Sequence, residues 1–440
     1  MQKIVTEQVV EIDNPTSFQS KTIFESIIKQ GKKLENKYII KCNLIKSTRS
    51  KLFFHLVCLE NIEGIIKEPF IPPSLKSKHA PHSSSKNISC LIIPTGIGAR
   101  FGGYAGDANP LAKLFAKQNK YLLTHPNVVN GAVLTDIPDN LIYLEGFLLD
   151  QFLLGKISLS PSKNNKIGVL FDKGITDKRL EYEINVLNAT KAFYGCEITT
   201  WTTTAKPLKI KPTLNEGFSS GSIENIESLI DSALHLKSAG VTTIAICCAI
   251  PDLELNKKYS TGLGIDPIGG IESMISRTVS AITGLVSAHA PVLISEEQVD
   301  YKNISPLSAS EYIAQTFLPS VISGLRFAPQ IKQQIRNQKS EIRNNEVSKI
   351  IVPYNAFGSL GVLYSNELFK NVVLVNENKT CLNVNPKHIN TTINKVNSYK
   401  DLIAAKTINE SGIDMDVFKR PIESITKSET SPLIDISSQR

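Results

Sequence analysis

The stretch with the strongest chemical pattern runs from Ser89 to Pro110. Its apolar residues 90–93 predict a buried strand, which leads into a loop with five glycines between positions 96 and 106. Glycines adopt positive φ and allow close backbone approach, and a strand that opens through such a loop toward a helix commonly binds anions. We therefore predict a small anionic ligand here; an irregular connection that needs flexibility is the alternative. The candidate ligand-binding residues are Thr95, Gly96, Gly98, Gly102, Gly103 and Gly106.

This loop does not match the standard nucleotide motifs. A P-loop ends in Gly-Lys-Ser/Thr, whereas Gly106 is followed by Asp107, and no acid that could bind a ribose lies between Asp107 and Asp136. Asp107 is itself a candidate catalytic residue. Because a carboxylate repels a bound anion unless a cation or proton lies between them, Asp107 predicts either proton transfer or a divalent ion.

Two histidines and two further acids are the other catalytic candidates. His289 lies in Ala-His-Ala-Pro and His125 in Thr-His-Pro-Asn. An imidazole titrates near neutrality and can move a proton or bind a metal; a buried structural histidine is the alternative for each. Asp266 and Glu272 flank a second glycine turn, where stabilisation of a helix N-terminus is the alternative role. These side chains would suffice for a divalent metal, but no HxH or HExxH spacing links them, so the metal stays open.

Several polar side chains follow the predicted carboxyl ends of strands. In open α/β sheets, ligands bind at that edge, so we predict that these residues share one cleft, with Asn355 and Glu377 among the ligand-binding residues. Ordinary loop polarity is the alternative. The residues concerned are Thr95, Asp172, Asp252, His289, Asn355 and Glu377.

Some longer runs carry a family resemblance. They resemble the signature of domain of unknown function 3326, a family of uncharacterised cyanobacterial and plastid-encoded proteins, over about residues 88–386. The resemblance implies no particular reaction, and it implies a location in the chloroplast stroma, or in the cytoplasm of a cyanobacterium. The matching runs include LTHPNVVNGA (123–132), IYLEGFLLDQFLLG (142–155), GLGIDPIGGIES (262–273), SAHAP (287–291) and PYNAFG (353–358).

The elements that must position these residues alternate between apolar strands and amphipathic helices. Examples are a strand at 166–171, a helix at 177–194, a strand at 241–250 and a helix at 268–283. This alternation predicts an α/β fold with a mainly parallel sheet and helices on both faces. A strand at 285–288 would end just before His289, and Ser308-x-x-Glu311 predicts a capping box.

The chain divides by composition into four parts. Residues 1–67 predict a small N-terminal α+β unit, and the Pro- and Ser-rich residues 68–87 predict a linker. Residues 88–396 form the predicted α/β core, and residues 397–440 a polar, partly disordered tail.

Composition narrows the function classes. The net charge of the 440 residues is +8, but Lys and Arg are scattered, which does not favour nucleic-acid binding. Seven cysteines, mostly in apolar runs and without a CxxC pair, suit a reducing compartment, and without a run of eighteen apolar residues we expect no membrane span. We predict an enzyme acting on a small anionic metabolite, a class that includes phosphorylated ones. A non-catalytic ligand sensor or an assembly factor of the photosynthetic compartment is the alternative.

Overall fold

The computed structural model describes residues 5–31, 34, 37–60, 87–251, 257–293, 304–333, 341–403 and 405–426. Asp252, which the sequence placed among the strand-end candidates, lies outside the described residues, as do most of the predicted linker and the last fourteen positions.

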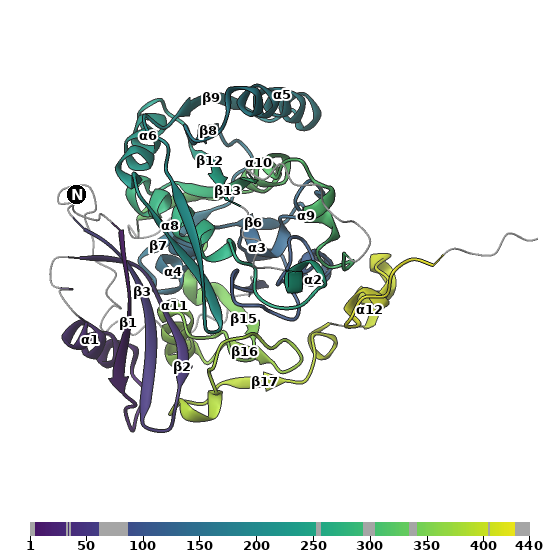
Figure 1. Cartoon of the computed structure of the whole chain (residues 1–440). Coiled ribbons are helices and arrows are strands. Elements are labelled where there is room, and N and C mark those ends of the chain that lie inside the picture. Colours follow the sequence, from purple (N-terminus) through teal and green to yellow (C-terminus); the bar gives the residue numbers. More distant parts are fainter. Residues whose placement is uncertain are drawn as a thin grey trace, which may run out of the picture.

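A six-stranded sheet forms one half of the core (Figure 1). Its order is β17 (Asn394–Val396), β16 (Val372–Val375), β15 (Val347–Pro353), β4 (Ile88–Leu91), β5 (Tyr121–Thr124) and β6 (Leu141–Tyr143), and every pairing is parallel. Its helices include α2 (Asn109–Gln118), α3 (Pro126–Val129), α4 (Gly146–Leu153) and α11 (Leu360–Phe369). The strands are short, and β4 is buried along its whole length, as expected of a parallel sheet covered on both faces.

A second parallel sheet has the order β13 (Val286–Leu293), β12 (Thr243–Ile250), β8 (Ile167–Phe171) and β9 (Ile198–Thr203). Its neighbours are α5 (Asp177–Tyr194), α6 (Ile226–Ser238), α8 (Gly269–Thr283) and α10 (Leu318–Leu325), and this half occupies the top of Figure 1. The α/β fold with parallel sheets is therefore confirmed, with two parallel sheets in the core.

One strand boundary differs from its prediction in a way that moves a candidate residue. Strand β13 continues through Leu293, so His289 lies inside the strand, opposite Ile246, and not beyond its end. Because β13 is at the edge of its sheet, it can include Pro291, which has no N–H to donate to a neighbouring strand.

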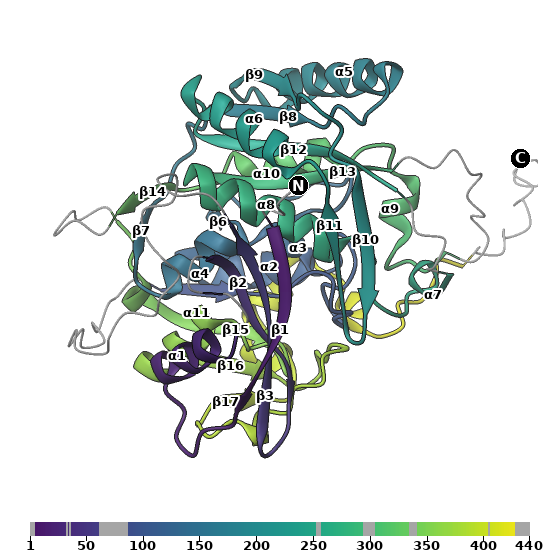
Figure 2. The same ribbon diagram turned by 60° about the vertical axis from the view of Figure 1, so that its left-hand side comes forward.

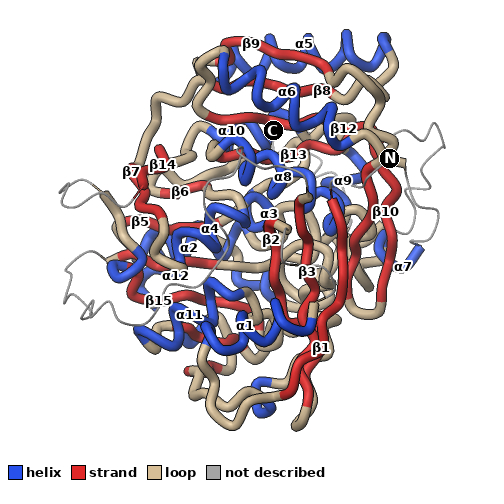
Figure 3. The backbone as a smooth tube through the Cα atoms, turned by 90° about the vertical axis from the view of Figure 1, so that its left-hand side faces the viewer, coloured by secondary structure: helices blue, strands red, loops and turns tan. Residues whose placement is uncertain are grey.

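The N-terminal unit contains α1 (Ser20–Gln30) and the antiparallel strands β1 (Val5–Asp13), β3 (Lys51–Leu59) and β2 (Tyr38–Ser47), in that order across the sheet. The predicted small α+β unit is confirmed. Its sheet packs against the core: the Leu44 N–H donates to the Gly358 carbonyl over 2.9 Å, and its buried side chains join the main hydrophobic cluster. Figure 3 shows β2 and β3 in front of α3 and α4.

A hairpin of β10 (Ile210–Asn215) and β11 (Phe218–Ile223) extends from the four-stranded half toward the N-terminal sheet (Figure 2). The Phe218 ring of β11 lies 4.8 Å from the His55 ring of β3, so the hairpin contacts the N-terminal sheet there. The remaining elements are β7 (Ile157–Ser160), paired antiparallel with β14 (Gln330–Gln333), the short helices α7 (Lys257–Ser260), α9 (Ala309–Ile313) and α12 (Ala405–Ser411), and 3₁₀ turns at 344–346, 386–388, 400–402 and 415–418.

Within the described part of the chain, no helix combines the length and apolar character needed to cross a bilayer.

Candidate functional site

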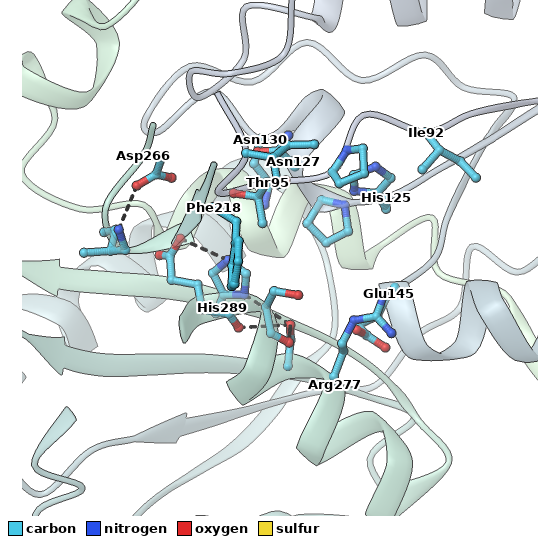
Figure 4. A pocket seen from close by; sticks show the side chains of 18 of the residues that line it. Ile92, Thr95, His125, Asn127, Asn130, Glu145, Phe218, Asp266, Arg277 and His289 are labelled. Atoms are coloured by element: carbon cyan, nitrogen blue, oxygen red, sulfur yellow. Dashed lines mark hydrogen bonds and ion pairs between the residues drawn. The ribbon is translucent and has the colours of Figure 1, made fainter. Parts of the chain in front are cut away.

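A cavity of about 240 Å³ lies where the two parallel sheets, the N-terminal sheet and the β10–β11 hairpin meet. The residues that line it include five of the predicted site residues: Thr95, His125, Asp266, Glu272 and His289. Figure 4 shows Asp266 on one side of the cavity and Arg277 with Glu145 on the other, with His289 and Phe218 between them. Of the six strand-end residues predicted to share one cleft, Thr95 and His289 line this cavity, whereas Asp172, Asn355 and Glu377 do not.

The Asp266 side of the cavity carries three carboxyl groups. Asp266 precedes α8, Glu272 lies in its first turn, and Glu311 lies on α9. Burial, together with the neighbouring Glu272 carboxylate, raises the pKa of Asp266 to about 7. Burial and the Asp266 carboxylate likewise raise the pKa of Glu311 to about 8. At neutral pH Asp266 and Glu311 are therefore partly protonated and can act as acids as well as bases.

Glu311 does not form the predicted capping box. The Ser308 side chain makes no cap hydrogen bond, and Glu311 Oε1 accepts 2.8 Å hydrogen bonds from the Ala105 N–H and the Tyr259 hydroxyl. Helix α9 has only five residues, so a capping box would stabilise little helix. The Glu311 side chain instead links α9 to the glycine-rich loop.

His289 is held by groups at both ring nitrogens. Its Nε2 lies 3.4 Å from Glu272 Oε2, and its Nδ1 lies 3.3 Å from Ser276 Oγ. A carboxylate beside one ring nitrogen orients the imidazole, which is the arrangement of a general acid–base pair.

The opposite side of the cavity carries the cations. Arg277 on α8 donates from Nη1 to the Ile40 carbonyl over 2.9 Å and to Asp150 Oδ2 over 3.0 Å. Lys41 follows Ile40 on β2 and also lines the cavity, and among the described residues its Nζ has no hydrogen-bond or ion-pair partner. Burial and the nearby Arg277 charge lower the pKa of Lys41 to about 8, so the amine is still mostly protonated at pH 7.

His125 and Glu145 complete this side. The Ile93 N–H donates to His125 Nε2 over 3.0 Å, and burial lowers the pKa of His125 to about 3. A neutral imidazole that accepts at Nε2 has its proton on Nδ1, so the geometry favours a hydrogen-bond donor over a proton carrier. Glu145 caps α4 by accepting from the Phe147 N–H over 2.7 Å, and burial raises its pKa to about 7.

The glycine-rich loop forms part of the wall through Pro94, Thr95, Ile97 and Ala105, but none of its predicted glycines lines the cavity. Several loop amides donate to other parts of the protein: the Arg100 N–H to the Lys379 carbonyl over 2.9 Å and the Phe101 N–H to Asn378 Oδ1 over 3.1 Å. These two amides hold the loop in its fold and are not available to an anion.

Replacing Gly102 by alanine is expected to lower the free energy of unfolding by about 1–3 kcal/mol, whether or not a ligand is present. Its φ is +80°, which L side chains rarely adopt, and an added Cβ would lie 2.7 Å from Ile93 Cγ2. Urea unfolding measures the change, with Gly240→Ala as control, because Gly240 has a φ of +82° and open space around it. An equal loss at both positions would show that backbone strain alone acts, without the Ile93 contact.

Besides the five glycines, three predicted site residues lie away from the cavity. Asp107 is buried, and its Oδ2 lies 3.3 Å from Arg420 Nη2. Asn355 bonds through Nδ2 to the Thr380 and Leu382 carbonyls, and Glu377 Oε1 accepts from the Tyr399 N–H over 2.6 Å. Asp172, the other strand-end acid, accepts from the N–H groups of Gly174 and Leu208. Each of these side chains has a structural partner.

Sequence reasoning missed Lys41, Arg277 and Glu311 as site residues. Arg277 has a visible signal, since it is the only charged residue of its helix after Glu272. For Lys41 the only signal in the sequence is a charged residue in a largely apolar strand. Glu311 was interpreted as a helix cap. Although His125, His289 and carboxylates border one cavity, no group of three or more described His, Cys, Asp or Glu side chains is arranged to hold a metal ion.

Comparisons with known proteins bear on this site. Residues 88–419 match the model of a family described as a protein of unknown function (DUF3326). An uncharacterised lipoprotein of Synechococcus sp. is 34% identical to this chain over 333 residues, which cover 74% of this chain and 91% of that protein. No solved structure matches the chain. The family predicted from the sequence is confirmed, and the strand that carries Lys41 lies outside the matched residues.

Proposed function

This chain belongs to the family described as a protein of unknown function (DUF3326), and we propose that it is an enzyme that binds a small anionic metabolite in the cavity between its sheets. The proposal replaces the glycine-rich loop by Lys41 and Arg277 as the site for the anionic group. The loop then serves as a wall, through Thr95 and Ala105.

The observation that carries this proposal is that cationic and acid–base groups lie on separate sides of one cavity. Cationic groups lie on one side, and a histidine–carboxylate pair with further carboxyls of raised pKa lies on the other. Titratable groups poised near neutrality in a cavity are typical of active sites. Structural ion pairs also shift pKa values, but a purely structural cluster has no need of an unpartnered lysine.

Roles follow from the geometry. Lys41 and Arg277 would bind the anionic group by charge-assisted hydrogen bonds. His289, oriented by Glu272, would take a proton from the substrate or return one, and Asp266 would act as the second proton carrier. His125 would donate a hydrogen bond to a polar atom of the substrate. The group that reacts is not determined by these residues, so the proposal names acid–base chemistry only.

Thermal stabilisation by simple anions tests the proposal. Acetate, pentanoate, phosphate and sulfate at matched ionic strength should raise the melting temperature of the wild type, because a ligand of the folded state stabilises it. The effect should be lost in Lys41→Met and kept in Lys46→Met, an exposed lysine on the same strand. If no anion stabilises the wild type, or if Lys41→Met responds equally, the proposed anion site is wrong.

A non-catalytic ligand sensor would have the same binding behaviour. Turnover separates the two roles, since an enzyme would convert its bound metabolite and His289→Gln would leave it unconverted. For the location, we propose the chloroplast stroma or the cytoplasm of a cyanobacterium. The seven free cysteines, five of them buried, fit such a reducing compartment.

A further inference from the structure

We propose that the metabolite carries a cationic group as well as the anionic one, and that the carboxyls around Glu272 bind this cation. The inference rests on the proposed function, because it concerns the other end of the same cavity. The ligand class is thus a small zwitterion, such as an amino acid whose amine and acid are several atoms apart.

Unsatisfied buried atoms support this at both ends. Glu272 is 7% exposed, and its Oε1 is shielded from solvent and has no hydrogen-bond partner within the described part of the chain. Arg277 is 8% exposed, and its Nε is likewise without a partner there. A buried polar atom without a partner costs stability. A bound ligand with a donor at one end and an acceptor at the other would satisfy both.

The carboxyl cluster supports a cation more directly. Asp266, Glu272 and Glu311 lie close together. The charge of Glu272 raises the pKa of Asp266, and the charges of Asp266 and Glu272 raise the pKa of Glu311. Like charges this close are relieved either by bound protons or by a bound cation. The other titratable groups facing them are His289 from β13, Tyr259 from α7 and Tyr104 from the glycine-rich loop. The two tyrosines carry no positive charge, and one imidazolium at His289 would balance only one of the three carboxylates, so a further cation is needed. A ligand ammonium would provide it.

The spacing of Glu272 and Arg277 guides the choice of probe. Glu272 and Arg277 are five residues apart on α8, which corresponds to about 7.5 Å along the helix axis. A five-carbon ω-amino acid spans a distance of this order, so 5-aminopentanoate is a suitable probe, with pentanoate and pentylamine as its single-charge counterparts.

The test compares these three probes on the full chain by ligand-observed NMR titration and thermal shift at matched ionic strength. We expect 5-aminopentanoate to bind at least about tenfold more tightly than pentanoate, since one charge-assisted hydrogen bond is worth about this factor. Because the amine needs deprotonated carboxylates, the affinity for pentylamine should rise from pH 6 to pH 8, whereas that for pentanoate should fall as Lys41 and the acids lose protons.

A variant of Glu272 distinguishes binding from structure. Glu272→Gln should remove the preference for 5-aminopentanoate and leave pentanoate binding intact or tighter, whereas Glu181→Gln, on an exposed face of α5, should change neither. On the wild type alone, equal binding of pentanoate and 5-aminopentanoate would overturn this inference and leave the proposed function standing. If neither pentanoate nor 5-aminopentanoate binds, both this inference and the proposed function are contradicted.

Discussion

Replacing Arg277 by methionine is expected to lower the free energy of unfolding at pH 7.5 by about 3–5 kcal/mol, the cost of breaking a buried ion pair. The guanidinium lies 3.0 Å from Asp150 Oδ2, and both side chains are almost fully buried. Without Arg277, the Asp150 carboxylate would stay in a site where burial already raises its pKa. The Ile40 carbonyl would also lose its side-chain donor.

The loss of stability in Arg277→Met should also depend on pH. Without its cation, Asp150 would take up a proton more readily in the folded state than in the unfolded state. The difference in stability between the variant and the wild type should therefore shrink as the pH falls from 7.5 to 5.5. Lys166→Met is the control, because Lys166 lies 3.9 Å from Glu197 on the surface, where a pair is worth about 1 kcal/mol or less. An Arg277→Met loss no larger than that of the control would contradict a buried pair.

Replacing Lys41 by methionine is expected to act in the opposite direction and to raise the free energy of unfolding at pH 7 by about 1–3 kcal/mol. Burial lowers the pKa of the folded-state amine to about 8, below the value of about 10.4 in an unfolded chain. The charged form therefore destabilises the folded state, and methionine has a similar length without the charge. A residue that costs stability in the free protein is typical of a binding site.

The sign of this shift defines the pH range in which the effect appears. A base with a lowered folded-state pKa costs its full stability below that pKa, and the cost disappears as the pH rises from about 8 to about 10.4. The gain from Lys41→Met, measured by urea unfolding, should thus be present at pH 7 and nearly absent at pH 10. Lys46→Met should change stability by less than about 0.5 kcal/mol at both. Destabilisation by Lys41→Met at pH 7 would show that the amine has a structural partner.

The fold could be predicted where local signals determine it. The helix at 177–194 has the predicted bounds because Thr176 caps its start and Gly195, at φ +60°, ends it. The extent of β13 could not be predicted, since Pro291 indicates the end of a strand unless the strand lies at a sheet edge. The division into two parallel sheets could not be predicted either, because strand–helix alternation is the same in both and does not indicate which strands pair.

The candidate site could be predicted only in part, for a related reason. Asp266, Glu272 and His289 fall in short runs with visible motifs, and the fold brings them together. Lys41 enters the cavity from the N-terminal sheet through contacts far apart in the sequence, such as the hydrogen bond from Arg277 to Ile40. The glycines of the loop were predicted to bind a ligand, but they do not line this cavity, and Gly106 is closely packed, since a Cβ there would lie 2.6 Å from Gly131 Cα.

The most direct test of the proposed binding site is the identity of the small molecules released when the purified full chain is denatured. Mass spectrometry should find a metabolite that carries a carboxylate or phosphate, close to one per chain, with the wild type and with Lys46→Met. Its amount should fall at least about tenfold with Lys41→Met, since a charge-assisted hydrogen bond is lost. Release of no such molecule from the wild type, or of equal amounts from Lys41→Met, would contradict an anion site at Lys41 and Arg277.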